Sequence, residues 1–541
     1  MRAAIAAFLT TAAFLAAPMA NAAPPGTPHV TVGADTKQLI FDWDDAVGAG
    51  YYRLLYKVGS GAYKPLIDNI PAATTQVKLG VPVHLQSWSL IRYAVAACNT
   101  SGCTNSAAIF PQNLMLDSIG YFKASNTDAG DNFGNSLVLS DDGRTLAVNA
   151  EVERSSASGV NGNQADNSSP WSGAVYVFRR ASTGWRQEAY LKAGVNHSDQ
   201  YFGSAANLPG KAIAINANGS LLAIGTPLQE DPITFAPVGA VYIFQKSSSG
   251  NWSLAATLRS PSPEEGYQFG HSVELSLDGR TLKVNSRVSA GQGGFITNAH
   301  IFVWQGDTWQ HSVTLAPFFA GDDCRIVRLS GDGNTLVSAC QNVSTGATRL
   351  ETRKRSGNTW THVSDQPLNS QASNIGLALN VDATTMALQE IRAPQQAVGI
   401  YRWMGAAWIR EAGFPASPAS TTVGKYGLAL ELNRTGNMLA IGDAFALENG
   451  AGVSPKSMPG IEPRGAVYVW RRNDSNATWT LRSVIKSPNP GVGDYFGTSI
   501  AFCGTGNALA ISAEAEDSKS KGVDGDRTDD SSTDSGAAYL Y

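Results

Sequence analysis

The chain has 541 residues, of which 43% are hydrophobic and 16% charged, and its formal net charge is −4. This composition is typical of a globular protein that can bury sizeable cores. The near-neutral charge gives no electrostatic reason to expect nucleic acid or an anionic membrane surface as a partner. The 55 glycines indicate a chain with many turns.

Residues 1–22 have the pattern of an export signal. Arg2 supplies a positive charge, and Ala3–Ala17 is an apolar run too short to span a bilayer comfortably. An Ala-Asn-Ala triplet ending at Ala22 is a small-x-small cleavage site, so the mature chain is expected to begin at Ala23. A membrane anchor is the alternative, which the short run disfavours. We expect a protein that is secreted, or held at the cell surface or in the periplasm.

A first folded unit is expected over residues 28–111. Its short alternating apolar segments have the spacing of a β-sandwich, with Trp43 inside one strand as a core residue. The segment Tyr93–Asn99, followed by Ser101 and Gly102, resembles the late-strand signature of a fibronectin type III domain. The resemblance implies a spacer or adhesion module. It also implies that Cys98 and Cys103, which flank the turn, form a small disulfide clasp.

A second unit, residues 112–541, contains seven copies of one pattern. Each copy has four short segments of period two bounded by turn residues, which predicts four strands per copy and a seven-bladed β-propeller. Five copies begin with an aromatic residue and glycine: Phe133-Gly134, Phe202-Gly203, Phe269-Gly270, Tyr426-Gly427 and Phe496-Gly497. The fourth copy has Asp323-Cys324 there, and the fifth is the weakest.

The phase of the repeat predicts how the ring closes. The chain ends at Tyr541 on the third strand of blade seven, which therefore lacks its outer strand. The segment Met115–Ser125 has the pattern of the outer strands and should complete that blade. Such a strand supplied from the N-terminal side hides sheet edges.

The Phe-Gly starts, the Leu-Ala-Val second strands and the Gly-Ala-Val-Tyr third strands together resemble the FG-GAP repeat of integrin α-type propellers. Members of that family often carry an Asp-x-Asp-x-Asp-Gly calcium site between the first and second strands. Here a tight turn such as Asp141-Asp142-Gly143 stands in its place and offers too few oxygen ligands. Calcium is therefore not expected at these turns.

Acidic and amide side chains gather instead between the second and third strands of blades one and seven. The segments Gly159–Ser169 and Gly522–Ser532 match almost position for position. Alternating Asp, Asn and Gly suit calcium, with Asp524, Asp526 and Asp529 as candidate ligands, but they equally suit a solvated turn. The candidate ligand-binding residues of the two loops are Asn161, Asn163, Asp166, Asp524, Asp526 and Asp529.

The remaining cysteines indicate an oxidising compartment. Cys324 and Cys340 lie symmetrically about Asp332 in a Ser-Gly-Asp-Gly turn, which makes them cross-strand neighbours able to form a disulfide. Cys503 is left over. No basic neighbour in sequence would lower its pKa, so we expect a buried packing thiol, with a reactive thiol as the alternative.

Catalytic patterns are sparse. Ser272 lies in a Gly-His-Ser-Val segment, but Glu274 occupies the position where a nucleophile elbow needs its second glycine, and the segment aligns with ordinary first strands. The seven histidines show no zinc spacing. Six tryptophans recur in phase, which favours packing between blades over a sugar platform: Trp185, Trp252, Trp309, Trp360, Trp408 and Trp479.

These features predict an exported, non-enzymatic binding or adhesion protein that is a monomer and recognises a protein or a polysaccharide. Long loops between second and third strands are expected in blades six, seven, one and two, which are consecutive in a closed ring and would form one arc. An alternative is that the loops are tolerated insertions. The alternative function is a lyase or hydrolase of extracellular polysaccharides, which would place Asp or Glu, Arg, Tyr and His together in the central channel.

Overall fold

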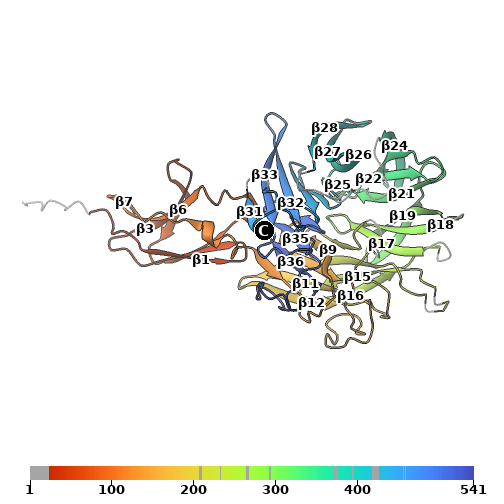
Figure 1. Ribbon diagram of the computed structural model, residues 1–541, viewed down its shortest axis with the longest axis horizontal. Helices are drawn as coiled ribbons and strands as arrows, with labels where there is room; N and C mark the ends of the chain where they lie inside the picture. Colours follow the sequence, from red (N-terminus) through yellow and green to blue (C-terminus); the bar gives the residue numbers. More distant parts are fainter. Residues whose placement is uncertain are drawn as a thin grey trace, which may run out of the picture. The chain divides into compact units, whose positions relative to one another are not determined.

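The computed structural model describes residues 23–205, 210–231, 233–234, 236–262, 267–291, 294–368, 376–392, 395–416, 426–454, 456 and 458–541. The expected signal peptide, residues 1–22, lies outside these ranges. Almost all regular elements of the described chain are strands (Figure 1), and the chain divides into two compact units. Unit 1 contains residues up to Gly33, Ile40–Leu79 and Trp88–Gln112, and unit 2 contains Ala34–Leu39, Gly80–Ser87 and Asn113–Tyr541.

Unit 1 is built on two antiparallel sheets. The first has the order β1 (Val30–Asp35), β2 (Gln38–Trp43), β5 (Gln76–Gly80); the second has the order β4 (Lys64–Pro71), β3 (Tyr51–Val58), β6 (Ile91–Asn99), β7 (Gly102–Asn105).

Aromatic residues hold the sheets of unit 1 together. Strand β2 buries every second residue, as its alternating sequence predicts. Its Trp43 ring lies 5.3 Å from Tyr52 on β3, and its Phe41 ring lies 5.3 Å from Tyr93 on β6. The sheets therefore enclose the core of a β-sandwich.

Short 3-10 helices are the only helices among the described residues: η1 (Val83–Leu85) and η2 (Pro111–Leu114). Neither has the length or apolar content needed to cross a membrane.

Unit 2 contains seven antiparallel sheets, numbered one to seven here in chain order. Sheet one comprises β9 (Phe133–Leu139), β10 (Thr145–Ala150), β11 (Ala174–Ala181) and β12 (Gly184–Leu191). Sheet two comprises β13 (Ile213–Ile215), β14 (Leu221–Thr226), β15 (Ala240–Lys246) and β16 (Trp252–Leu258). Sheet three comprises β17 (Tyr267–Leu275), β18 (Thr281–Gly291), β19 (Gly294–Gln305) and β20 (Thr308–Leu315). Sheets four and five comprise β21 (Asp322–Leu329), β22 (Thr335–Asn342), β23 (Thr348–Ser356), β24 (Thr359–Leu368); and β25 (Leu377–Leu379), β26 (Thr385–Arg392), β27 (Gln395–Trp403), β28 (Trp408–Pro415).

Sheets six and seven depart from this simple order. Sheet six has the order β29 (Leu430–Leu432), β30 (Met438–Asp443), β32 (Ala466–Asn473), β33 (Thr478–Lys486), β31 (Gly452–Ser454), so a piece of its long loop adds an outer strand that the sequence did not predict. Sheet seven has the order β34 (Ile500–Phe502), β35 (Leu509–Ala513), β36 (Ala537–Leu540), β8 (Gly120–Phe122). Because β8 pairs with β36, the expectation that the segment before the first repeat completes the last sheet is confirmed.

The sheets form a closed ring. The inner strand of each sheet contacts the inner strand of the next, and β34 of sheet seven contacts β9 of sheet one. The turns that follow the inner strands are joined in the same cyclic order by backbone hydrogen bonds: Asp142 N to Ala217 O (3.1 Å), Ala217 N to Leu277 O (2.9 Å), Leu277 N to Gly331 O (2.8 Å), Asp332 N to Val381 O (2.8 Å), Val381 N to Arg434 O (3.2 Å), Arg434 N to Gly504 O (3.1 Å) and Gly504 N to Asp141 O (2.9 Å). Unit 2 is therefore a β-propeller.

Local chemistry explains the turns of this ring. In sheet one the Ser140 hydroxyl donates to Asp142 and accepts from the backbone N–H of Thr145 at 2.9 Å. Gly143 has a φ of 67°, which L-amino acids other than glycine seldom adopt. The Ser-x-Asp-Gly sequence thus satisfies its own backbone and leaves the turn tight, as predicted.

Both expected disulfides are present, Cys98–Cys103 and Cys324–Cys340, and Cys503 is a free, buried thiol. The second bridge joins β21 to β22 across a hairpin, as the symmetry of the sequence about Asp332 predicted.

Candidate functional site

The long loops of sheets one and seven fold back onto the outer edges of their own sheets. Val160 forms a β-bridge with Leu191 on the outer strand β12, and Val523 forms the equivalent bridge with Phe122 on β8. Each loop therefore covers an edge that would otherwise present unpaired backbone groups. In sheet six, β31 does the same by pairing with β33.

A buried ion pair lies under each of the two loops. In sheet one the Lys192 ammonium is 2.8 Å from Glu153 Oε2, and in sheet seven the Lys123 ammonium is 2.9 Å from Glu516 Oε2. All four side chains are at most 2% exposed. Burial lowers the pKa of both lysines, and the adjacent glutamate opposes that shift.

Other polar groups complete each pair in the same way. Lys192 also donates to Ser172 Oγ, and the Tyr190 hydroxyl donates to Glu153 Oε1 at 2.8 Å. The counterparts in sheet seven are Ser535, which accepts from Lys123, and Tyr121, which donates to Glu516 Oε1 at 2.8 Å. A buried charge is tolerated only when it is paired and hydrogen-bonded, and both networks meet that condition. These pairs were not predicted from the sequence, although the Glu and Lys recur at matching positions of the two copies.

A buried carboxyl group accompanies each network. Asp131 and Asp494 both precede the Phe-Gly start by two residues, and burial raises the pKa of each to about 7. Each accepts one backbone hydrogen bond, from Asp128 N at 3.0 Å and from Gly491 N at 2.8 Å respectively. These two groups titrate near neutral pH because they are removed from water.

The structure places the six predicted binding residues within these loops, with their side chains hydrogen-bonded to the loop itself or to the outer strand. Asn161 Oδ1 accepts from Tyr190 N at 2.9 Å, and Asp524 Oδ1 accepts from Tyr121 N at 2.9 Å, so these two are equivalent. Asn163 Oδ1 accepts from Ala165 N at 3.0 Å. The side chains of all three residues therefore stabilise the conformation of the loops.

The remaining three predicted residues accept hydrogen bonds from nearby backbone and hydroxyl groups. Asp166 accepts from Ser156 and Ser168, which lowers its pKa to about 2. Hydrogen bonds likewise lower the pKa of Asp526, mainly from Thr528, and of Asp529, mainly from Ser531. These carboxylates stabilise turns of their own loop.

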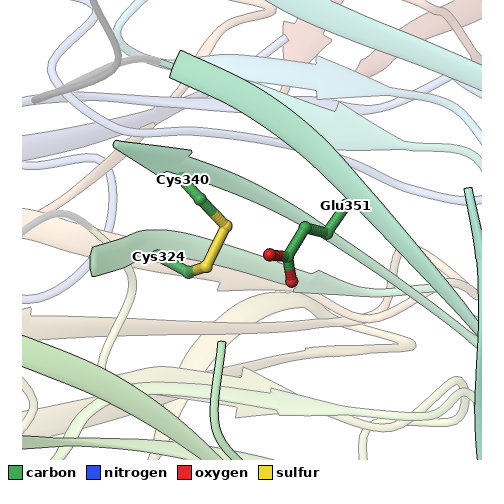
Figure 2. Close-up of side chains that lie close together, drawn as sticks. All are labelled: Cys324, Cys340 and Glu351. Atoms are coloured by element: carbon green, nitrogen blue, oxygen red, sulfur yellow. A yellow bond between two sulfur atoms is a disulfide. The ribbon is translucent and has the colours of Figure 1, made fainter. Parts of the chain in front are cut away.

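Asp524, Asp526 and Asp529 do not converge on one point. Among the described residues, the group of three potential ligands whose atoms lie within 4.8 Å of one another is Cys324, Cys340 and Glu351. Figure 2 shows that the two sulfur atoms of this group are joined in the disulfide, which removes them as metal ligands. Calcium binding by the loop of sheet seven stays a prediction without support from carboxylate geometry.

Exposed apolar side chains lie on three of the four long loops. Trp171 on the loop of sheet one is 46% exposed, Ile233 on that of sheet two is 83% exposed, and Ile461 on that of sheet six is 92% exposed. Single exposed apolar residues are common, but these three share one class of loop on consecutive sheets. The sequence pattern favoured the acidic residues of the loops as binding residues and did not predict these three.

The central channel contains a cavity of about 240 Å³ lined by the inner strands. Its charged groups lie in pairs: Arg328 with Glu274 at 2.7 Å, Arg434 with Asp141 at 3.0 Å, and Lys211 with Glu431 at 3.9 Å. Burial raises the pKa of Glu431 and lowers that of Lys211. The described lining contains acids and bases but neither His nor Tyr, so only part of the set expected for an enzyme is brought together.

Ser272 lies in the inner strand β17, as its alignment with other first strands predicted. It is 2% exposed and its hydroxyl accepts from the Lys283 ammonium at 3.0 Å. Burial lowers the pKa of the adjacent His271 to about 3. Ser272 and His271 are thus buried residues of the sheet.

Comparison with known proteins finds no matching family model and no matching curated protein. Solved structures do match. The Cps50 (Swd1) propeller domain of Myceliophteria thermophila is 9% identical, with 78% of this chain and 98% of that chain covered and a TM-score of 0.43. The Dos1 propeller is 10% identical, with 78% and 95% covered and a TM-score of 0.40. An oligogalacturonate lyase from Vibrio parahaemolyticus is 9% identical, with 84% and 100% covered and a TM-score of 0.38. These similarities say nothing about activity.

Proposed function

We propose that this chain is an exported, non-enzymatic binding protein that recognises an extracellular protein or polysaccharide through the long loops of sheets six, seven, one and two. In this proposal residues 1–22 are a signal peptide, 28–111 a fibronectin type III-like domain and 112–541 a seven-bladed FG-GAP-like propeller. The protein acts as a monomer.

The observation that carries the proposal is that exposed apolar residues lie on three long loops, of which the loop of sheet one is held by a buried ion pair and a β-bridge. Buried ion pairs and β-bridges hold the loops of sheets one and seven, while Trp171, Ile233 and Ile461 remain exposed on the loops of sheets one, two and six. A rigid loop loses little conformational entropy on binding, and exposed aromatic and aliphatic groups supply apolar contact area.

Arrays of extracellular proteins and polysaccharides, probed with the intact protein, test the proposal. The variant Trp171→Ser/Ile233→Ser/Ile461→Ser should lose the array signal while keeping its melting temperature. A matched control replaces three exposed residues of sheets four and five, Val343, Met404 and Ile409, which are 51%, 70% and 54% exposed. The control should bind as the parent protein does. Equal binding by the loop variant would refute the proposal, and turnover of a bound polysaccharide would favour the enzyme instead.

A further inference from the structure

One position of the repeat distinguishes sheets three and five from the others. In sheets one to six, the recurring tryptophan of the fourth strand faces a residue on the third strand across the ladder. In sheets one, two, four and six that partner is a cation: Arg180 with Trp185, Lys246 with Trp252, Arg355 with Trp360 and Arg472 with Trp479. In sheets three and five it is a second tryptophan: Trp304 with Trp309 and Trp403 with Trp408.

In sheet five, a lysine of the neighbouring sheet four lies over the tryptophan pair. The Lys354 ammonium, from sheet four, lies 5.0 Å from the centre of the Trp403 ring. Trp408 is 3% exposed, and its indole N–H donates to Thr352 at 3.0 Å. A cation over an indole face and a buried partner account for both rings as packing groups.

In sheet three the Trp304 and Trp309 rings are half-buried and their centres lie 5.7 Å apart, and among the described residues no cation lies over them as Lys354 does over Trp403. At the position that Lys354 occupies in sheet four, sheet two has Gln245: each directly precedes the residue opposite the recurring tryptophan. A cavity of about 210 Å³ lies between sheets two and three here. Its lining includes both indoles and several polar side chains: Trp304, Trp309, Gln245, Arg280, Ser220 and Asp278.

The polar groups of this groove are available to a ligand. Gln245 and Arg280 are exposed, and among the described residues neither side chain has a hydrogen-bond or ion-pair partner. The Asp278 carboxylate accepts from Ser276 and from the Arg280 N–H, so its turn fixes its position. Arg280 and Asp278 carry opposite charges, which leaves the groove without net charge.

A half-buried indole pair that lines a cavity beside polar groups with no net charge suits a pyranose ring. The aliphatic C–H groups on one face of a sugar carry partial positive charge and match the negative face of an indole. The hydroxyl groups around the ring can accept from the guanidinium and exchange hydrogen bonds with the Gln245 amide. Ligand sites commonly combine aromatic walls with a few polar groups in this way.

We propose that the groove formed by Trp304, Trp309, Gln245 and Arg280 binds a pyranose unit of an uncharged saccharide. This site is separate from the long loops, so a saccharide could be held here whether or not the loops bind a partner.

Titration calorimetry of the full chain with cellohexaose, mannohexaose and chitohexaose tests the site. At least one should bind. Trp304→Arg places the cation of the other sheets opposite Trp309 and should weaken that binding by at least about tenfold. Gln245→Lys places a lysine at the position equivalent to Lys354, which lies over the Trp403 ring of sheet five. This variant should weaken saccharide binding similarly without removing either tryptophan.

Trp403→Arg in sheet five is the matched control and should leave saccharide binding unchanged. If Trp304→Arg fails to fold, Gln245→Lys alone decides the outcome. The proposal is overturned if none of the three hexasaccharides binds, or if binding survives Gln245→Lys. On the polysaccharide array, a signal lost in Gln245→Lys and kept in the loop variant belongs to this groove, and a signal lost in the loop variant and kept in Gln245→Lys belongs to the loops. Failure of this site and failure of the proposed function are therefore distinguishable.

Discussion

Sheets one and seven differ from sheets four and five in what joins their second and third strands. In sheets one and seven a long loop returns to the outer edge of its sheet over a buried lysine–glutamate pair. In sheet four, β22 and β23 are joined by a short hairpin, and a disulfide connects β21 to β22. The long loops of sheets one and seven thus lie over a lysine–glutamate pair whose two members are both buried, whereas the short hairpin of sheet four lies beside the disulfide and an Arg349–Asp322 pair whose arginine is partly exposed.

Breaking one anchor should have the largest effect. Glu153→Gln leaves the Lys192 charge buried without its partner, which should lower the free energy of unfolding by about 3–5 kcal/mol. Chemical denaturation measures the change. The double variant Glu153→Gln/Lys192→Met should cost less, because it removes both charges. A loss below about 1 kcal/mol, as expected for an exposed pair such as Glu462 with Arg464, would contradict the anchor role.

Removing the disulfide of sheet four should have the next largest effect. Its cysteines are 16 residues apart, and closing a loop of that size contributes about 3 kcal/mol in the chain-entropy model. Cys324→Ala/Cys340→Ala should therefore lower the free energy of unfolding by about that amount. Cys98→Ala/Cys103→Ala should cost less, since its separation is only 5 residues. Equal losses from the two double variants would show that loop size does not determine the contribution.

The buried carboxyl groups of sheets one and seven should make stability depend on pH. Burial raises the folded-state pKa of Asp131 to about 7, above its unfolded value of about 3.9, so the folded protein binds more protons between these values. Stability contributed by this group should fall as the pH rises from about 4 to about 7 and then level off. Glu153, Asp128 and Arg154 act on the same carboxyl group.

Asp131→Asn keeps an acceptor for the Asp128 N–H and should reduce this decline. Melting temperatures of both proteins across the range measure it, with Asp307→Asn, at an exposed position of another sheet, as the control. An unchanged pH profile in Asp131→Asn would mean that the group is ionised in the folded protein.

The smallest effect is expected from calcium chelation. The carboxylates of Asp166, Asp526 and Asp529 already accept hydrogen bonds from their own loops. EDTA should therefore shift the melting temperature by less than about 2 °C, whereas loss of a structural ion typically removes several kcal/mol. A large shift that added calcium reverses would restore the calcium hypothesis for the loop of sheet seven.

The repeat made most of the propeller predictable. Period-two alternation, Ser-x-Asp-Gly turns and the missing last strand predicted the strands, the tight turns and the pairing of β8 with β36. The symmetry about Asp332 predicted the disulfide between Cys324 and Cys340. These features are local in sequence or recur along the chain, so they can be recognised without knowing which distant residues are in contact.

The candidate sites were harder to predict because they depend on contacts between distant residues. Lys123 meets Glu516 across 393 positions of the chain, and no local pattern joins them. The acidic residues of the loops resembled cation ligands because calcium sites and turns that hydrogen-bond to their own backbone are both rich in Asp and Asn. Likewise, the recurrence of tryptophan predicted packing. Trp185, Trp252 and Trp408 are buried, and Trp309, Trp360 and Trp479 pack against core clusters. It could not show that Trp304 and Trp309 also line a cavity with Gln245.

Hydrogen–deuterium exchange with an array-identified partner tests the central claim most directly. If the long loops bind, partner addition should slow backbone exchange in residues 151–173, 227–239 and 444–465, which contain Trp171, Ile233 and Ile461. The turns on the opposite face of the ring, around Asp141, Leu277 and Arg434, should exchange as before. Protection confined to those turns, with the loops unchanged, would contradict the account.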